Sequence, residues 1–201
     1  MKFTIITGPG RCGTSALTQF FINSNLYRVD AVGGLDPTMK AGLESRDSIL
    51  INSLIYTSNL MEFVKDHAYY EILNLYNKSD IVKSPLFFYT NSYTYWQEVL
   101  KPYGGIQVIL LTRDNLDDIF TSAKNIKSPD WDKYTPTLLQ NQWNLNIQIL
   151  ENNNIPFVTM EYPKFSKDPN YLFKNLKKLE LGTWNPTLSE IQTLSKNTFT
   201  T

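Results

Sequence analysis

The sequence is poor in the residues that form disulfides and zinc sites, with one cysteine and one histidine among its 201 residues. A single cysteine excludes an internal disulfide and is typical of a reducing compartment. A single histidine without a cysteine cluster excludes a zinc site of the usual His and Cys ligands. No apolar run is long enough for a transmembrane helix, and a strand expected at residues 3–6 leaves no room for a signal peptide. We therefore expect a cytoplasmic protein with no membrane partner and no bound metal.

An excess of charge of either sign is also missing. The chain has 19 basic and 19 acidic residues and a formal net charge of zero. Proteins that bind nucleic acids usually carry a basic excess or a basic stripe, so we predict no nucleic-acid partner. The length and the 42% hydrophobic content suit one domain with a substantial core. We predict a single domain over residues 1–201.

The segment Gly8-Pro9-Gly10-Arg11-Cys12-Gly13-Thr14-Ser15 lies between an apolar run and a helical pattern. A strand, a glycine-rich turn and a helix in this order direct backbone N–H groups and a helix N-terminus at a phosphate-sized anion. The spacing is that of a P-loop, but Thr14 occupies the lysine position and Arg11 is the only cation in the loop. This pattern favours an activated phosphate other than ATP. The alternative is an ordinary glycine turn.

Two further cations follow short apolar segments. Lys83 ends the run 80–83, before Pro85, and Arg113 follows the run 106–111. Ligands of open α/β sheets bind beyond the carboxyl ends of the strands, so we expect both side chains at the edge that carries the glycine loop. An arginine can bind phosphate through two hydrogen bonds, and the hydroxyl of Thr121 on the next helix would complete such a site. Taken alone, Arg113 would more simply form a surface salt bridge.

The rest of the chain alternates between strand and helix patterns. Further strands are expected at 27–32 and 156–160, and the helices are expected to include two or three over 38–78, a long one over 138–150, one that begins at 168–169 and stops by Gly182, and a last one over 188–194. This alternation predicts an α/β fold of three layers, the P-loop type, with a central, mostly parallel sheet of four to five strands flanked by helices.

In this order the motifs resemble those of the sulfotransferases that use 3′-phosphoadenosine 5′-phosphosulfate (PAPS). Residues 10–15 are similar to the 5′-phosphosulfate loop of that family, and residues 81–85 to the Lys-Ser-Pro strand end of many bacterial members. Residues 111–114 with Thr121 look like the 3′-phosphate motif. Residues 158–162 with Asp168-Pro169 are like the C-terminal pattern of the family. The resemblance spans residues 3–182.

The resemblance implies PAPS as co-substrate, adenosine 3′,5′-bisphosphate (PAP) as product, and transfer without a metal. The 5′-phosphosulfate would be held by residues of the loop, namely Gly10, Arg11, Cys12, Gly13, Thr14 and Ser15. Arg113 and Thr121 would hold the 3′-phosphate. Arg11 and Lys83 would stabilise the departing phosphate, and Glu44 is the first candidate for the general base, with Asp36 the second.

Four positions depart from the family pattern. Thr121 stands where serine is usual, although it keeps the hydroxyl. Cys12 stands where serine is common, Leu116 where a second basic residue is common, and Pro85 where many members place a histidine base.

The expected activity is transfer of a sulfuryl group to a hydroxyl or amine of a small-molecule, carbohydrate or peptide acceptor. The acceptor would be gripped by residues 33–75 and 127–136. The alternatives are a P-loop nucleotide kinase or phosphotransferase, and a nucleotide-binding relative without catalytic activity.

Overall fold

The strands of the computed structural model form one all-parallel sheet in the order β2-β3-β1-β4-β5. The structure describes residues 1–30, 46–58, 63–88, 91–125, 135–182 and 184–199. The strands are β1 (Phe3–Thr7), β2 (Val29–Asp30), β3 (Ile81–Lys83), β4 (Ile106–Arg113) and β5 (Phe157–Tyr162). The predicted α/β class, with its parallel sheet flanked by helices, is confirmed.

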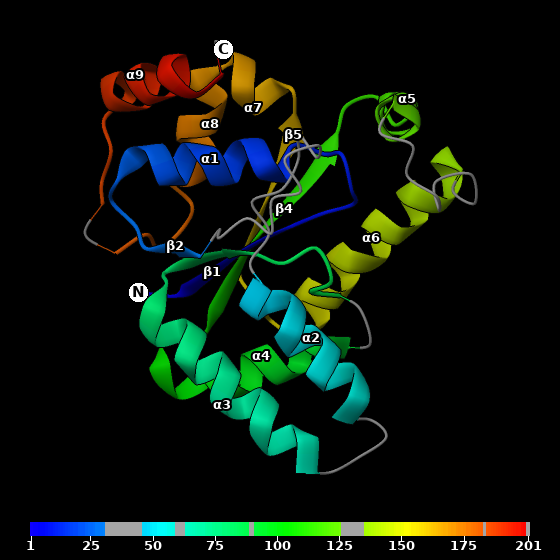
Figure 1. The fold of residues 1–201 in the computed structure, drawn as a ribbon. Coiled ribbons are helices and arrows are strands. Elements are labelled where there is room, and N and C mark those ends of the chain that lie inside the picture. The colour runs from blue at the N-terminus through cyan, green and yellow to red at the C-terminus, as the bar shows by residue number, and fades with distance from the viewer. Residues whose placement is uncertain (31–45, 59–62, 89–90, 126–134, 183, 200–201) are drawn as a thin grey trace.

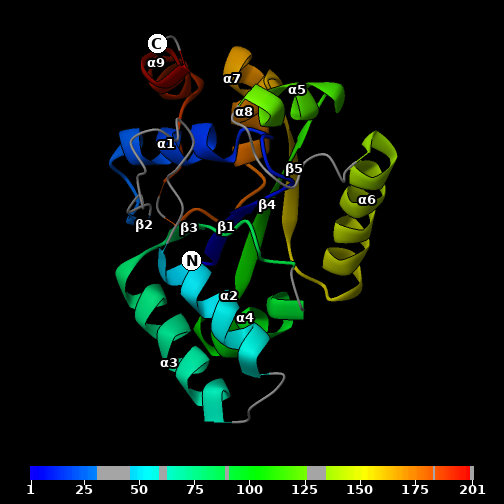
Figure 2. The ribbon, with the colours of Figure 1, turned by 45° about the vertical axis from the view of Figure 1, so that its right-hand side comes forward.

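Helices cover both faces of the sheet, which gives the predicted three layers (Figures 1 and 2). The helices of one layer are α1 (Thr14–Ser24), α7 (Lys164–Lys167), α8 (Pro169–Leu176) and α9 (Leu188–Phe199). Those of the other are α2 (Arg46–Ser58), α3 (Phe63–Lys78), α4 (Ser92–Leu100) and α6 (Pro136–Asn152). Helix α5 (Asp117–Asn125) follows the carboxyl end of β4, and a short 3₁₀ helix (Lys101–Tyr103) precedes this strand.

The apolar side chains of the central strands alternate between two cores. On β4, Ile106, Val108 and Leu110 pack with α2, α3 and α4, whereas Ile109 and Leu111 pack with α1, α7 and α8. A strand that is buried on both faces is apolar at nearly every position, and a buried polar side chain on it needs a hydrogen-bond partner. This explains why β4 is mostly apolar up to Leu111; the exception, Gln107, is buried and donates to the Thr4 hydroxyl at 2.9 Å.

Two C-terminal predictions were wrong. Helix α8 ends at Leu176 rather than near Gly182, and α9 continues to Phe199 beyond the expected end at 194. The ring of Phe199 stacks on Phe20 with 5.9 Å between centroids and meets Phe165 edge-on at the same distance. These aromatic contacts pack the end of α9 against α1 and α7. None of the described helices is long and apolar enough to span a membrane.

The edge strand β2 has only two residues and is supported by an ion pair at its start. The Arg28 side chain donates to both carboxylate oxygens of Asp80, at 3.2 Å from Nε and 2.7 Å from Nη2, and the Arg28 backbone N–H donates to the same carboxylate. Burial alone would raise the pKa of Asp80, but the hydrogen bonds and charge of Arg28 outweigh it and lower this pKa. The pair thus joins β2 to β3.

We expect Asp80→Asn to lower the free energy of unfolding by about 1 kcal/mol near neutral pH, because the charge-assisted bonds are lost. The folded-state pKa of Asp80 lies below its unfolded value. Its contribution is therefore complete above the unfolded pKa, about 3.9, and is lost as the pH falls through the folded value. Urea unfolding near pH 7 and near pH 2 measures this loss. The free energies of unfolding of the unmodified protein and of Asp80→Asn should become equal at low pH. The control is Glu180→Gln, which removes the exposed pair with Lys2 and should cost less. A gap of unchanged size at both pH values would contradict the prediction.

Candidate functional site

The glycine loop, residues 8–13, joins the carboxyl end of β1 to the start of α1. Arg11 and Gly13 have left-handed backbones, with φ of +66° and +86°. Turns of this kind direct neighbouring N–H groups to one side. Gly13 is the N-cap of α1 and provides no side-chain cap, and the first turn carries no acidic residue. The positive end of this helix is therefore suited to an external anion.

The loop lies so close to β4 and β5 that two positions exclude a side chain. A Cβ on Gly8 would lie 2.4 Å from the backbone oxygen of Leu111, and a Cβ on Gly13 would lie 2.5 Å from the ring of Tyr162. Glycine at these positions lets the loop rest on the ends of both strands.

Arg113, the last residue of β4, reaches the loop. Its Nη1 donates to the backbone oxygen of Arg11 at 3.1 Å, and its guanidinium carbon lies 5.2 Å from the centre of the Tyr162 ring. Its Nη2 lies 3.5 Å from a carboxylate oxygen of Asp118 on α5. Among the described residues, nothing accepts a hydrogen bond from its buried Nε. Arg113 is thus held against the loop while its buried Nε has no partner among the described residues.

The Arg11 side chain crosses to α5, where its Nε donates to the Ser122 hydroxyl at 2.9 Å. Ser122 is a site residue that the motif analysis did not single out, although it directly follows the predicted Thr121. Thr121 itself is exposed and donates to the Asp117 backbone oxygen at 3.2 Å. The structure therefore brings Arg11, Arg113 and Ser122 together, and turns the Thr121 hydroxyl toward its own helix.

Lys83 approaches the loop from the other side. It ends β3, is only 4% exposed, and its Nζ donates to the Ser15 hydroxyl in the first turn of α1 at 3.0 Å. Cys12 is fully buried between these elements. Burial raises the pKa of its thiol to about 12, although backbone hydrogen bonds and the charges of Lys83 and Arg113 act in the opposite direction. The thiol is therefore protonated near neutral pH and contributes no negative charge.

The expected general bases, Glu44 and Asp36, lie outside the described residues. Within the described ranges, no three His, Cys, Asp or Glu side chains come together in a way that could hold a metal ion. His67 has a side chain 59% exposed and lies 3.9 Å from a Glu71 oxygen on the same helix.

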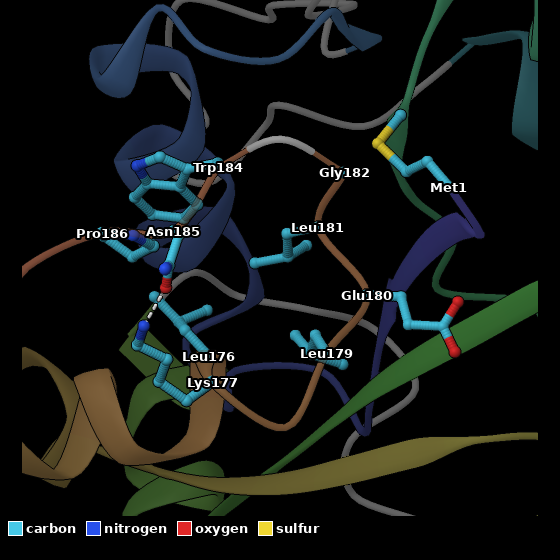
Figure 3. A pocket seen from close by; sticks show the side chains of 10 residues that line it. All are labelled: Met1, Leu176, Lys177, Leu179, Glu180, Leu181, Gly182, Trp184, Asn185 and Pro186. Carbon is cyan, nitrogen blue, oxygen red and sulfur yellow. Dashed lines mark hydrogen bonds between the residues drawn. The ribbon is translucent and has the colours of Figure 1, made fainter.

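A hollow of about 420 Å³ lies at the opposite edge of the sheet (Figure 3). Met1, just before the amino end of β1, lines it together with Leu176, Lys177, residues 179–182 and residues 184–186. The glycine loop follows the carboxyl end of the same strand. The hollow is therefore separate from the cluster of cations.

We expect Gly13→Ala to destabilise the fold by about 2–3 kcal/mol, because the new methyl group would meet the Tyr162 ring and the backbone is left-handed. The matched control is Gly105→Ala, at φ +80° with nothing within 4 Å of the added Cβ, which should show only the backbone strain of about 1 kcal/mol. Denaturant midpoints of the two variants measure the difference. Equal losses would contradict close packing of the loop against the ring.

A comparison of the sequence with models of known protein families and with curated proteins finds no match. The geometry of the loop and its three cations, together with the motifs of the sequence, therefore has to indicate the function.

Proposed function

We propose that this protein is a PAPS-dependent sulfotransferase that moves a sulfuryl group to a hydroxyl or amine of a small-molecule, carbohydrate or peptide acceptor. The observation that carries the proposal is the contact between Arg113 and the glycine loop, 3.1 Å from Nη1 to the Arg11 oxygen. It adds a guanidinium group from a second strand end to a loop already suited to one anion. A ligand with two anionic groups fits such an arrangement.

The residues fit PAPS in two respects. The loop and the uncapped start of α1 suit the 5′-phosphosulfate. The buried Nε of Arg113 has no acceptor among the described residues and suits an oxygen of the 3′-phosphate. Asp118 opposes this fit, since its carboxylate attracts the same guanidinium at 3.5 Å. In the proposal, the 3′-phosphate displaces Asp118 from Arg113, and Thr121 contributes once its hydroxyl turns away from the Asp117 oxygen.

Bound PAPS supplies an electrophilic sulfuryl group and a phosphate leaving group. The chain's own residues orient these groups and stabilise charge. Lys83 and Arg11 place positive charge near the loop, where negative charge grows on the departing phosphate. Ser15, bonded to Lys83, fixes the direction of its ammonium group. A carboxylate, with Glu44 the first candidate and Asp36 the second, takes the proton of the acceptor.

We also propose that the protein is located in the cytoplasm. Its one cysteine, Cys12, is a buried free thiol, which suits a reducing compartment.

We expect PAP, without metal, to raise the melting temperature of the protein by several degrees at about one hundred times its dissociation constant, as mass action requires. ATP with Mg²⁺ should raise it less, because ATP has no 3′-phosphate for Arg113. Thermal unfolding with each ligand, and with Mg²⁺ alone as control, measures this. A larger shift with ATP and Mg²⁺ would favour the kinase alternative. A shift with PAP without transfer to any of a wide panel of acceptors would favour an inactive relative.

Substitutions of Arg113 and Lys83 should have different effects, the first on PAP binding and the second on the rate of transfer. We expect Arg113→Ala to weaken PAP binding by about tenfold to a hundredfold, the loss of a charge-assisted contact. Lys83→Ala should leave PAP binding within a few fold and lower the rate of transfer by about a hundredfold or more. Calorimetric titration with PAP and a transfer assay on the acceptor panel measure the two effects. The control is Lys101→Ala, an exposed lysine before the amino end of β4. If neither variant differs from this control, the site is misplaced.

A further inference from the structure

Tyr162 contacts both Arg113 and the glycine loop, and it packs on Phe165 of α7. It ends β5 and pairs in register with Arg113 on β4, so the two side chains leave neighbouring strands on the same face of the sheet. The guanidinium of Arg113 lies over its ring at 5.2 Å, a cation–π distance. The same ring closes the space beside Gly13, and Phe165 of α7 supports it with 5.7 Å between ring centres.

Arg113 contacts both the loop and Asp118, and the Tyr162 ring favours the contact with the loop. Its Nη1 donates to the loop at Arg11, whereas its Nη2 faces Asp118 on α5. An arginine side chain has many rotamers, and a group that covers one face of the guanidinium removes most of them. The Tyr162 ring covers Arg113 on the side of the loop. Without this ring, we expect the attraction of Asp118 to draw the guanidinium away from the loop.

We propose that Tyr162 is a positioning residue that sets the preference of the site for nucleotides with a 3′-phosphate. The inference depends on the function proposed above, because it assigns the 3′-phosphate to Arg113. The 5′-phosphate is served by the glycine loop and the start of α1, which do not need Arg113 in one orientation. Loss of the ring therefore weakens the contact to the 3′-phosphate and leaves the 5′ contact in place.

The test compares two ligands that differ only in the 3′-phosphate, PAP and adenosine 5′-monophosphate. Calorimetric titration gives the dissociation constants of both for the unmodified protein, Tyr162→Phe and Tyr162→Leu. We expect Tyr162→Leu to lower the preference for PAP by about three- to thirtyfold, the range of a partly buried cation–π contact. Tyr162→Phe keeps the ring and should retain the preference. The affinity for adenosine 5′-monophosphate should change little in both variants.

A purely structural role of Tyr162 predicts a different outcome. Equal weakening of both ligands in Tyr162→Leu, or an unchanged preference, would overturn the inference and leave the proposed function standing. An unmodified protein that does not prefer PAP would overturn the proposed function together with the inference. If circular dichroism shows that Tyr162→Leu does not fold, Tyr162→Met, of similar volume and also without a ring, takes its place with the same expected loss.

Discussion

The register between β1 and β4 is the constraint on which the site depends. Thr7, the last residue of β1, pairs with Leu110, so β4 continues for three residues beyond it, about 10 Å. The chain of β1 turns into the glycine loop at the height where β4 goes on to Arg113. Because the backbone pairing fixes this offset, the guanidinium of Arg113 lies beside the loop and not below it. A shift of one residue would also turn Arg113 to the opposite face of the sheet.

Close packing of the glycine loop against β4 and β5 fixes the loop relative to the cations at the strand ends. Gly8 and Gly13 let the loop contact the backbone of β4 and the ring of Tyr162, and these contacts leave the loop little freedom to move. On the other side β3 ends at Lys83, opposite Ile6, and the long lysine side chain covers the remaining height to reach Ser15. Strands β3 and β4 end at different heights, yet the long side chains of Lys83 and Arg113 both reach the glycine loop and the start of α1.

The sequence predicts the backbone of this site better than its side-chain contacts. Strands β1, β3 and β4 are mostly apolar because they are buried on both faces, and the strand-end rule then brings Lys83 and Arg113 to the loop. Strand β2 is stabilised by the ion pair between Arg28 and Asp80, and the pattern of apolar residues along the sequence cannot predict this pair. The bond from Arg11 to Ser122 and the stacking of Arg113 on Tyr162 depend on rotamers, which are chosen only when distant segments meet.

The electrostatics of the site explain how a chain of zero net charge can still favour an anion. Three cations converge on the loop, and the cysteine among them is a neutral thiol near pH 7, where an ordinary thiol is already mostly protonated and where burial raises its pKa further. The carboxylate of Asp118 contacts Arg113 from the side of α5, at 3.5 Å from its Nη2. An ionised thiol in place of this neutral one would cancel part of the positive charge within the loop itself. The protonated cysteine therefore leaves the positive charge of the loop for a ligand.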